Sequence, residues 1–420
     1  MTGIYNLSIA FYLLIIRIAA PFNKKASLWL QGRKNIFSIL KEKFKGNTTP
    51  VAWFHAASLG EFEQARPVIE AFRKEYPGYR ILLTFFSPSG YEIRKNYSGA
   101  DDIFYLPADT RKNARQFISI TNPSIVFFVK YEFWFHYLDE LKKQQIHTVL
   151  FSAIFRKEQP FFSKYTDFYK NILYCFSWLF VQDKISLSLL NSIAVQNASA
   201  VGDTRFDRVK DLVQAKKEIS IAEAFKNNQK VFIIGSAWNA DMEVLIPFIN
   251  EKEFSNLKFI IAPHEIHPEE IQRWKQKIKH KTSLYSEASE QTITSQEVLI
   301  IDNIGLLSSL YQYAEYAWIG GAYGKGLHNI LEAATYGMPV FFGTHYQKFK
   351  EAKDLIEEGA AFSVKNMDEF KKKFLPIWND EALRKSLAAT ASSYVQKNTG
   401  ATEAILQYLS THFKSPTSKS

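Results

Sequence analysis

Cysteine is almost missing from the chain: Cys175 is the single one among 420 residues. One thiol excludes an intrachain disulfide framework and is typical of a reducing compartment. A catalytic thiol is one interpretation, but the aromatic neighbours Tyr174, Phe176 and Trp178 favour a thiol buried in an apolar core.

Two kinds of motif are missing as well. The glycine-rich segments have neither the Walker A spacing nor the spacing of the dinucleotide-binding fingerprint. There are also no paired aspartates of the kind that metal-dependent nucleotide-sugar enzymes carry beside an apolar strand. We therefore expect chemistry that uses no metal ion and no cofactor, with helix dipoles in the place of the cation.

The chain is long, and it has many apolar side chains and an excess of positive charge. Its 420 residues exceed one ordinary core and suit two domains with a terminal extension. A content of 46% hydrophobic and 15% aromatic residues is that of a globular protein. The formal net charge of +10 predicts an anionic partner or surface.

The most apolar stretch runs from Ile4 to Ala20. It is slightly short for a bilayer span and lacks a small-residue cleavage site, so residues 1–22 are predicted to form an uncleaved membrane anchor or an interfacial helix. Basic residues follow it and predict contact with anionic lipid on the cytoplasmic side: Lys24, Lys25, Arg33, Lys34, Lys41, Lys43 and Lys45. The alternative is a buried N-terminal helix with a solvated basic face.

Residues 319–332 run from an apolar strand through a glycine-rich turn into a helical pattern. The turn predicts an anion-binding loop, because glycines allow close backbone approach and a helix beginning near residues 327–328 would present free N–H groups to a phosphate. Lys325 adds a mobile cation, and Glu332 shares a helix face with Asn329 and could accept from a ribose diol. The glycines are Gly320, Gly321, Gly324 and Gly326. A loop whose glycines serve only tight packing is the alternative.

The first part of the chain alternates apolar strands with helical segments, which predicts a parallel sheet. One strand, beginning at Val51, leads through a small-residue loop into a helix. Ser58 and Gly60 suit a loop that brings backbone N–H groups to a substrate, and Glu61 at the helix start is a candidate general base. A first-turn glutamate that serves only the helix dipole is the alternative.

A second candidate group follows the continuous apolar run at residues 124–129, which is typical of a central parallel strand. Lys130 and Glu132 lie at the carboxyl end of this strand. They either contact an anionic substrate or pair with each other.

The alternation restarts at Lys230, which implies a second Rossmann-like unit. Gly235 and Ser236 end its first strand in a turn suited to phosphate. Pro263 and His264 end the next strand, although a capping or core histidine is as typical of this position. The expected divisions are a first domain at 23–208, a linker at 209–229, a second domain at 230–414 and a disordered tail at 415–420.

Two doubly wound α/β domains whose loops face each other across a cleft are the plan of a GT-B glycosyltransferase, which is the fold class we expect. The motifs resemble those of the Kdo transferase family, which transfers 3-deoxy-D-manno-octulosonic acid (Kdo) from CMP-Kdo to a lipid A precursor. The resemblance covers nearly the whole chain and rests on residues 55–61, 202–207, 235–236, 263–264 and 320–332.

The resemblance implies a role for each candidate. Glu61 becomes the general base on the acceptor hydroxyl in an inverting transfer. The remaining acceptor contacts are Ser58, Gly60, Lys130 and Glu132. The contacts to CMP-Kdo are Gly235, Ser236, Pro263, His264, Gly320, Gly321, Gly324, Lys325, Gly326, Asn329 and Glu332. The resemblance further implies the cytoplasmic face of the inner membrane, so the positive charge requires no nucleic-acid partner.

Two segments depart from the family pattern. Lys130 stands where the family has a glutamate, although Glu132 and Trp134 are kept, and Ala262-Pro-His lacks the family's arginine, for which Lys325 is a substitute. The alternatives are another metal-independent GT-B enzyme that uses a UDP- or GDP-sugar and, more remotely, a non-enzymatic basic protein of the membrane surface. The sequence leaves open the number of Kdo residues added, the acylation and phosphorylation of the acceptor, the oligomeric state, and whether the N-terminal helix spans the membrane or lies flat.

Overall fold

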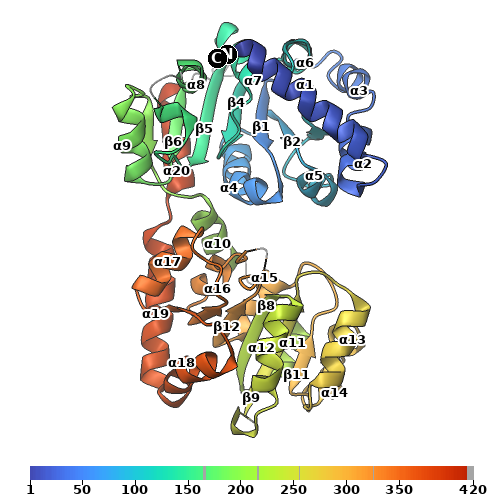
Figure 1. Cartoon of the computed structure of the whole chain (residues 1–420), viewed down its shortest axis with the longest axis vertical. Coiled ribbons are helices and arrows are strands. Elements are labelled where there is room, and N and C mark those ends of the chain that lie inside the picture. The colour runs from blue at the N-terminus through green and yellow to red at the C-terminus, as the bar shows by residue number, and fades with distance from the viewer. Residues whose placement is uncertain (164–166, 215–216, 255, 325, 414–420) are drawn as a thin grey trace. The chain divides into compact units, whose positions relative to one another are not determined.

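The computed structural model describes residues 1–163, 167–214, 217–254, 256–324 and 326–413. Lys325 and the expected tail at 415–420 lie outside the described residues. The chain divides into two compact units, one formed by Met1–Arg208 with Thr399–Ser420 and the other by Val209–Asn398. Each unit is an α/β layer structure built on a parallel sheet (Figure 1).

The first unit holds a seven-stranded sheet in the order β3-β2-β1-β4-β5-β6-β7. Its strands are β1 (Val51–Ala56), β2 (Arg80–Phe85), β3 (Asp102–Tyr105), β4 (Pro123–Val129), β5 (His147–Ala153), β6 (Trp178–Val181) and β7 (Ala198–Ala200). Its helices are α1 (Thr2–Ala19), α2 (Lys24–Gln31), α3 (Ile36–Lys43), α4 (Leu59–Glu75), α5 (Pro88–Arg94), α6 (Arg111–Thr121), α7 (Phe135–Lys143), α8 (Asp167–Leu173), α9 (Lys184–Ser192) and α20 (Ala401–His412). Helix α10 (Arg205–Gln214) crosses the boundary to the second unit.

The second unit holds a seven-stranded sheet in the order β10-β11-β9-β8-β12-β13-β14. Its strands are β8 (Lys230–Ala237), β9 (Leu257–Pro263), β10 (Thr282–Leu284), β11 (Val298–Ile300), β12 (Tyr316–Ile319), β13 (Val340–Phe342) and β14 (Ala361–Ser363). Its helices are α11 (Ser220–Lys226), α12 (Asn239–Ile249), α13 (Pro268–Lys277), α14 (Glu290–Ile293), α15 (Leu307–Leu310), α16 (Leu331–Thr335), α17 (Lys350–Glu357), α18 (Met367–Asn379) and α19 (Glu381–Lys397).

Side chains of the central strands alternate between two cores, as the two-residue period of a strand requires. Trp53 on β1 and Phe128 on β4 pack on one face of the first sheet, and Phe54 and Phe127 pack on the other. All four are fully buried. Because helices cover both faces, the apolar run expected as a central parallel strand needs no polar side and is confirmed as β4.

The structure divides the chain differently from the expected boundaries in two places. The stretch expected as a linker contains α11, whose Ala222 and Phe225 are buried. Helix α20, expected at the end of the second domain, packs against α4, and its Ile405 and Leu409 join the core of the first unit. Apolar side chains on one face of a helix are stable when that face is buried. The apolar faces of α11 and α20 are both buried in this way.

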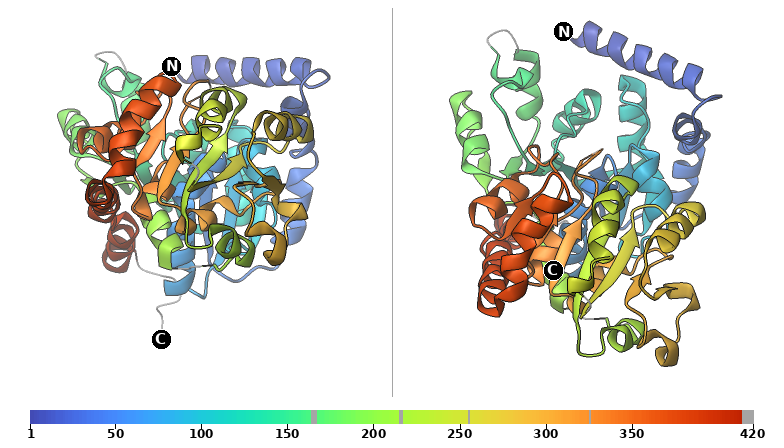
Figure 2. Two further views of the ribbon diagram at one scale, coloured as in Figure 1. Left: turned by 90° about the horizontal axis from the view of Figure 1, so that it is seen from below. Right: turned by 60° about the horizontal axis from the view of Figure 1, so that its bottom comes forward.

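Helix α1 is the N-terminal apolar helix that the sequence predicts. Among the described residues it is the one helix long and apolar enough, by length and composition, to cross a membrane. It runs along the outside of the first unit and buries none of its residues fully (Figure 2).

Candidate functional site

Both sheets reverse their strand order at one point, and the candidate residues gather there. In the first unit the reversal lies between β1 and β4, so the loops after Ala56 and after Val129 start side by side. In the second unit it lies between β8 and β12, which brings together the loops after Ala237 and after Ile319. Ligands of open α/β sheets bind at such switch points, outside the carboxyl ends of the strands.

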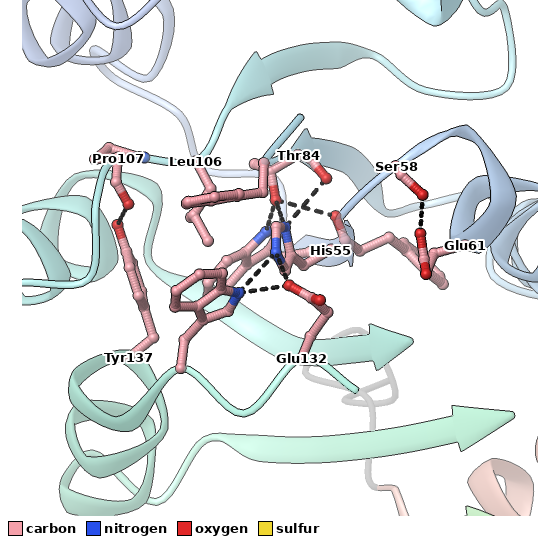
Figure 3. A network of polar contacts seen from close by, with 12 residues as sticks. His55, Ser58, Glu61, Thr84, Leu106, Pro107, Glu132 and Tyr137 are labelled. Carbon is pink, nitrogen blue, oxygen red and sulfur yellow. Dashed lines mark hydrogen bonds and ion pairs between the residues drawn. The ribbon is translucent and has the colours of Figure 1, made fainter. Parts of the chain in front are cut away.

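Glu61 lies in the first turn of α4, directly after the loop that leaves β1. Ser58 is the N-cap residue, but its hydroxyl donates to the Glu61 carboxylate instead of accepting from a backbone N–H (Figure 3). The carboxylate therefore has a fixed orientation while it remains partly exposed. An oriented, accessible carboxylate is what a general base requires.

Gly60 is exposed beside Glu61. A Cβ built at this glycine would meet only the Ser58 hydroxyl, at 3.8 Å. That is ordinary van der Waals contact, so packing inside the protein does not require a glycine here. The absent side chain leaves open space next to the Ser58 hydroxyl, which orients the Glu61 carboxylate.

Glu132 does not pair with Lys130, so the predicted alternative of an internal pair between them is wrong. The buried His55 lies between two partners: its Nε2 is 3.0 Å from Glu132 Oε2, and its Nδ1 is 2.9 Å from Thr84 Oγ1 (Figure 3). The Trp134 indole N–H also donates to Glu132 Oε2, at 2.5 Å. Glu132 is thus held inside the protein, 8% exposed.

Lys130 follows β4 in the left-handed region, with φ at 64°. Its backbone N–H donates to the Phe151 carbonyl of β5 at 2.9 Å, which holds this conformation in place. Within the described residues its ammonium group has no carboxylate partner. A cation without a counter-ion at the edge where Glu61 lies is available to an anionic substrate.

The segment at residues 202–207 follows β7 and serves the architecture of the first unit. Asp203, 4% exposed, accepts from Gln64 of α4 at 3.1 Å and pairs with Arg205 at 2.9 Å. Asp207 accepts from the backbone N–H groups of Gly400 and Thr402 and so caps α20. Residues 202–207 thereby connect α4 to α20.

In the glycine-rich loop after β12, several backbone N–H groups donate hydrogen bonds to carbonyls of the same loop. Those of Gly324 and Gly326 both donate to the Gly321 carbonyl, and that of His328 donates to the Gly320 carbonyl. The N–H of Gly321 donates to the buried Asp241 carboxylate at 3.0 Å. The prediction that a helix begins near residues 327–328 is wrong, because these N–H groups turn back into the loop and α16 begins only at Leu331.

Two of these glycines are required by packing. A Cβ at Gly320 would lie 2.2 Å from the Ser236 carbonyl oxygen, and Gly321 has φ at +95°, where a Cβ would lie 2.4 Å from the Gly326 carbonyl oxygen. A side chain at either position would displace backbone. The close contact between Gly320 and Ser236 also brings the loops of β8 and β12 together.

Asp241 links the start of α12 to β12 and to the glycine-rich loop through hydrogen bonds. This role was not predicted from the sequence. Its carboxylate accepts from the backbone N–H groups of Trp238 and Gly321 and from the Trp318 indole, each at 3.0 or 3.1 Å. Burial raises the pKa of Asp241 above its ordinary value, and the three N–H donors act in the opposite direction.

Asn329 and Glu332 lie together, but they do not share a helix face as predicted, because Asn329 precedes α16. The Asn329 amide donates to Glu332 at 3.2 Å, and its carbonyl oxygen accepts from the Leu331 N–H at 3.1 Å. Glu332 is partly exposed and lies in the first turn of α16. Lys325, predicted as the neighbouring cation, lies outside the described residues.

His264 is part of an aromatic stack that was not predicted. It lies 4.6 Å from the Trp238 ring and 4.1 Å from the His328 ring, centroid to centroid. The Trp238 indole N–H donates to His328 Nε2 at 2.9 Å, so the neutral imidazole carries its proton on Nδ1. Burial, together with His264, lowers the pKa of His328 to about 4. Pro263, Gly235 and Ser236 lie on the strand ends beside this stack.

No sequence pattern indicated the contacts of His55, Trp238 or Asp241, because each has partners far away along the chain. His55 and Glu132 are 77 positions apart, and Asp241 and Gly321 are 80 apart. Among the described residues no group of three or more His, Cys, Asp or Glu side chains could hold a metal ion. Chemistry without a metal stays a prediction.

Comparison with known proteins relates the chain to one family. Residues 32–208 match the family model described as 3-deoxy-D-manno-octulosonic-acid transferase (kdotransferase). The chain is 27% identical over 365 residues to the 3-deoxy-D-manno-octulosonic acid transferase of Rickettsia felis, which covers 85% of this chain and 78% of that protein. It is 27% identical over 335 residues to the Aquifex aeolicus protein of the same name, covering 78% of this chain and 86% of that protein.

Solved structures support the fold. The UDP-GlcNAc 2-epimerase of Neisseria meningitidis aligns with a TM-score of 0.62 at 14% identity, over 86% of this chain and 100% of that one. A glycosyltransferase from Rickettsia africae aligns with a TM-score of 0.55 at 12% identity, over 88% of this chain and 100% of that one. At such low identity the likeness concerns the fold alone, and the predicted GT-B class is confirmed.

Proposed function

We propose, because this chain belongs to the Kdo transferase family, that it transfers Kdo from CMP-Kdo to a lipid A precursor of the lipid IVA type. Family membership makes the protein a glycosyltransferase of lipopolysaccharide biosynthesis.

One observation carries the mechanism: the Ser58 hydroxyl orients the Glu61 carboxylate at the switch point of the first sheet. Glu61 removes the proton from a glucosamine hydroxyl of the acceptor, and the resulting oxygen attacks the anomeric carbon of Kdo from the side opposite the phosphate. The bond from that carbon to the phosphate oxygen breaks, CMP leaves with the electron pair, and the configuration inverts. Lys130, Gly60 and the Glu132 loop contact the acceptor.

The second unit binds the donor in this proposal. Gly235, Ser236, Pro263 and His264 end two neighbouring strands, and the loop at residues 320–332 ends the third. The hydrogen bonds from Gly324, Gly326 and His328 to the carbonyls of Gly320 and Gly321 hold these backbone groups in place before a ligand arrives, which lowers the cost of reorganisation. Asn329 and Glu332 are the proposed polar contacts to the nucleotide.

The location proposed is the cytoplasmic face of the inner membrane. Helix α1 exposes Ile4, Leu7, Phe11 and Ile18, a stripe at helical spacing. The basic segment after α1 adds attraction to anionic lipid. Vesicle flotation with and without anionic lipid measures both contributions.

The deciding experiment is Kdo transfer from CMP-Kdo, generated in situ, to a tetraacylated lipid A precursor, with products resolved by mass. Glu61→Gln should lower the rate by about 10²–10⁴-fold while CMP still binds. Glu63→Gln is the matched control, because Glu63 lies on the same helix and pairs instead with Arg94 at 2.9 Å. It should retain activity.

Product masses also count the Kdo residues added. Absence of product from folded, vesicle-bound wild type would overturn the Kdo assignment. Screening UDP- and GDP-sugars would then identify the donor of a different GT-B enzyme.

A further inference from the structure

Helix α1 has two different faces, and its inner face is joined to the acceptor side of the proposed site. The outer face carries the exposed apolar stripe that begins with Ile4 and Leu7. The inner face carries Tyr5, Asn6 and Tyr12, which contact the first unit through hydrogen bonds and ring packing. A helix that crossed a bilayer away from the protein would lose these contacts.

Tyr5 completes the N-terminal cap of α7. Its hydroxyl donates to Asp109 and accepts from the Phe135 N–H at 3.4 Å. Asp109, 1% exposed, also accepts from the N–H groups of His136 and Tyr137, each at 3.1 Å. The first three N–H groups of α7 are thus satisfied by Asp109 and Tyr5, since the N-cap residue Trp134 provides no side-chain cap.

Asn6 adds a second link to the same helix. Its side-chain oxygen lies 2.6 Å from His136 Nε2. Tyr5 also packs edge-on against Phe135, with ring centroids 5.6 Å apart. Two adjacent residues of α1 therefore contact the first turn of α7.

That turn directly follows the Lys130–Trp134 loop of the proposed acceptor site. Trp134, the N-cap residue, donates to Glu132. Its ring also lies 4.5 Å from Phe86, which is 6.0 Å from Tyr12 of α1. Helix α1 thus reaches the loop by two routes, one through the α7 cap and one through aromatic rings that pack at a tilt.

We infer that α1 lies flat on the membrane surface as a built-in part of the acceptor site, and that Tyr5 is a positioning residue that holds the Lys130–Trp134 loop through the cap of α7. The kinetic part of this inference rests on the proposed function, whereas the structural part does not. Helix α1 then has two roles, because its outer face contacts the membrane and its inner face holds the loop of the proposed acceptor site.

Tyr5→Phe tests the cap, and the same helix offers a matched control. Tyr12→Phe makes the same chemical change on the same helix, but the Tyr12 hydroxyl has no hydrogen-bond partner among the described residues. Hydrogen exchange of the peptide covering residues 134–138 should accelerate about tenfold in Tyr5→Phe, as expected when one charge-assisted hydrogen bond is lost. It should stay at the wild-type rate in Tyr12→Phe.

Kinetics separates positioning from a general loss of stability. Tyr5→Phe should raise the KM for the acceptor or lower kcat, with the KM for CMP-Kdo and vesicle flotation unchanged. Asn6→Ala is a second variant that removes the His136 contact without touching the Tyr5 ring, and it should show the same pattern. Wild-type exchange and wild-type acceptor kinetics in both variants would overturn the inference. If no variant transfers Kdo, the exchange rates still decide the structural part.

Labelling decides between a flat and a spanning helix. In a Cys175→Ser background, Gly3→Cys and Phe22→Cys place one thiol before and one after the apolar stripe, at positions with open space or 90% exposure. A membrane-impermeant maleimide should label both from the cytoplasmic side in inverted vesicles. Labelling of Gly3→Cys from the periplasmic side alone would show a spanning helix and overturn the flat placement.

Discussion

At the scale of single residues, the free space at Gly60 leads to a sharp prediction. Gly60→Ala should fold at least as stably as wild type, because alanine favours a helix by up to about 1 kcal/mol over glycine and its methyl group meets only Ser58. The same methyl group would lie beside the Ser58 hydroxyl, which orients the Glu61 carboxylate. We expect kcat/KM for the acceptor to fall by about tenfold or more, as one methyl group in a tight site can cause.

Thermal unfolding and transfer kinetics check this prediction together. A variant with a normal Tm and normal acceptor kinetics would show that Gly60 has no part in binding. A lowered Tm would show instead that the position is structural.

His328 gives a prediction about pH at the same scale. Its pKa is lowered to about 4 in the folded protein, whereas an unfolded histidine titrates near 6.5. The unfolded chain therefore binds a proton between these values and the folded protein does not, so this residue lowers stability as pH falls from about 6.5 to about 4. His328→Asn should flatten the fall of Tm over this range relative to wild type.

The indole of Trp238 fixes which nitrogen of His328 carries the proton, and this can be observed directly. Imidazole ¹⁵N shifts should show the Nδ1–H tautomer in wild type and a mixture in Trp238→Phe, which keeps a ring against His264. An unchanged tautomer in the variant would contradict the assigned role of the indole.

At the scale of elements, the strands could be predicted and the details of the loops could not. Apolar runs such as residues 124–129 have one stable environment, a parallel sheet covered on both faces. The start of α16 depends on where the N–H groups of the glycine loop go, and their acceptors include Asp241 on another helix. Local sequence carries no signal for such a partner.

In the candidate site, too, contacts between neighbours in the sequence could be predicted more easily than contacts between distant residues. Ser58 and Glu61 are three positions apart at the start of one helix, so local spacing is enough to bring them together. The pairing of Glu132 with His55 requires β1 and β4 to be neighbours, which is a property of the sheet order. The sequence alone offered Lys130 as a partner for Glu132, because it does not show that His55 lies beside Glu132 in the fold.

At the scale of the whole molecule, the chain passes from the first unit to the second near residue 208 and returns near residue 398. Helix α20 then closes the core of the first unit with Ile405 and Leu409, both fully buried. The stability of the first unit therefore depends on the last helix of the chain. Asp207 fixes that helix at its start by accepting from Gly400 and Thr402.

Leu409→Ala tests this dependence, because the change leaves a cavity beneath α20 that should cost about 2–5 kcal/mol. The loss should appear as faster hydrogen exchange in β1, β4 and α4, while β8 and β12 keep wild-type protection. Leu245→Ala, equally buried but in the second unit, should give the reverse pattern. Equal loss of protection in both units from either variant would show that they unfold as one cooperative body. Separate patterns would show that the two units have independent stabilities, although a single chain connects them twice.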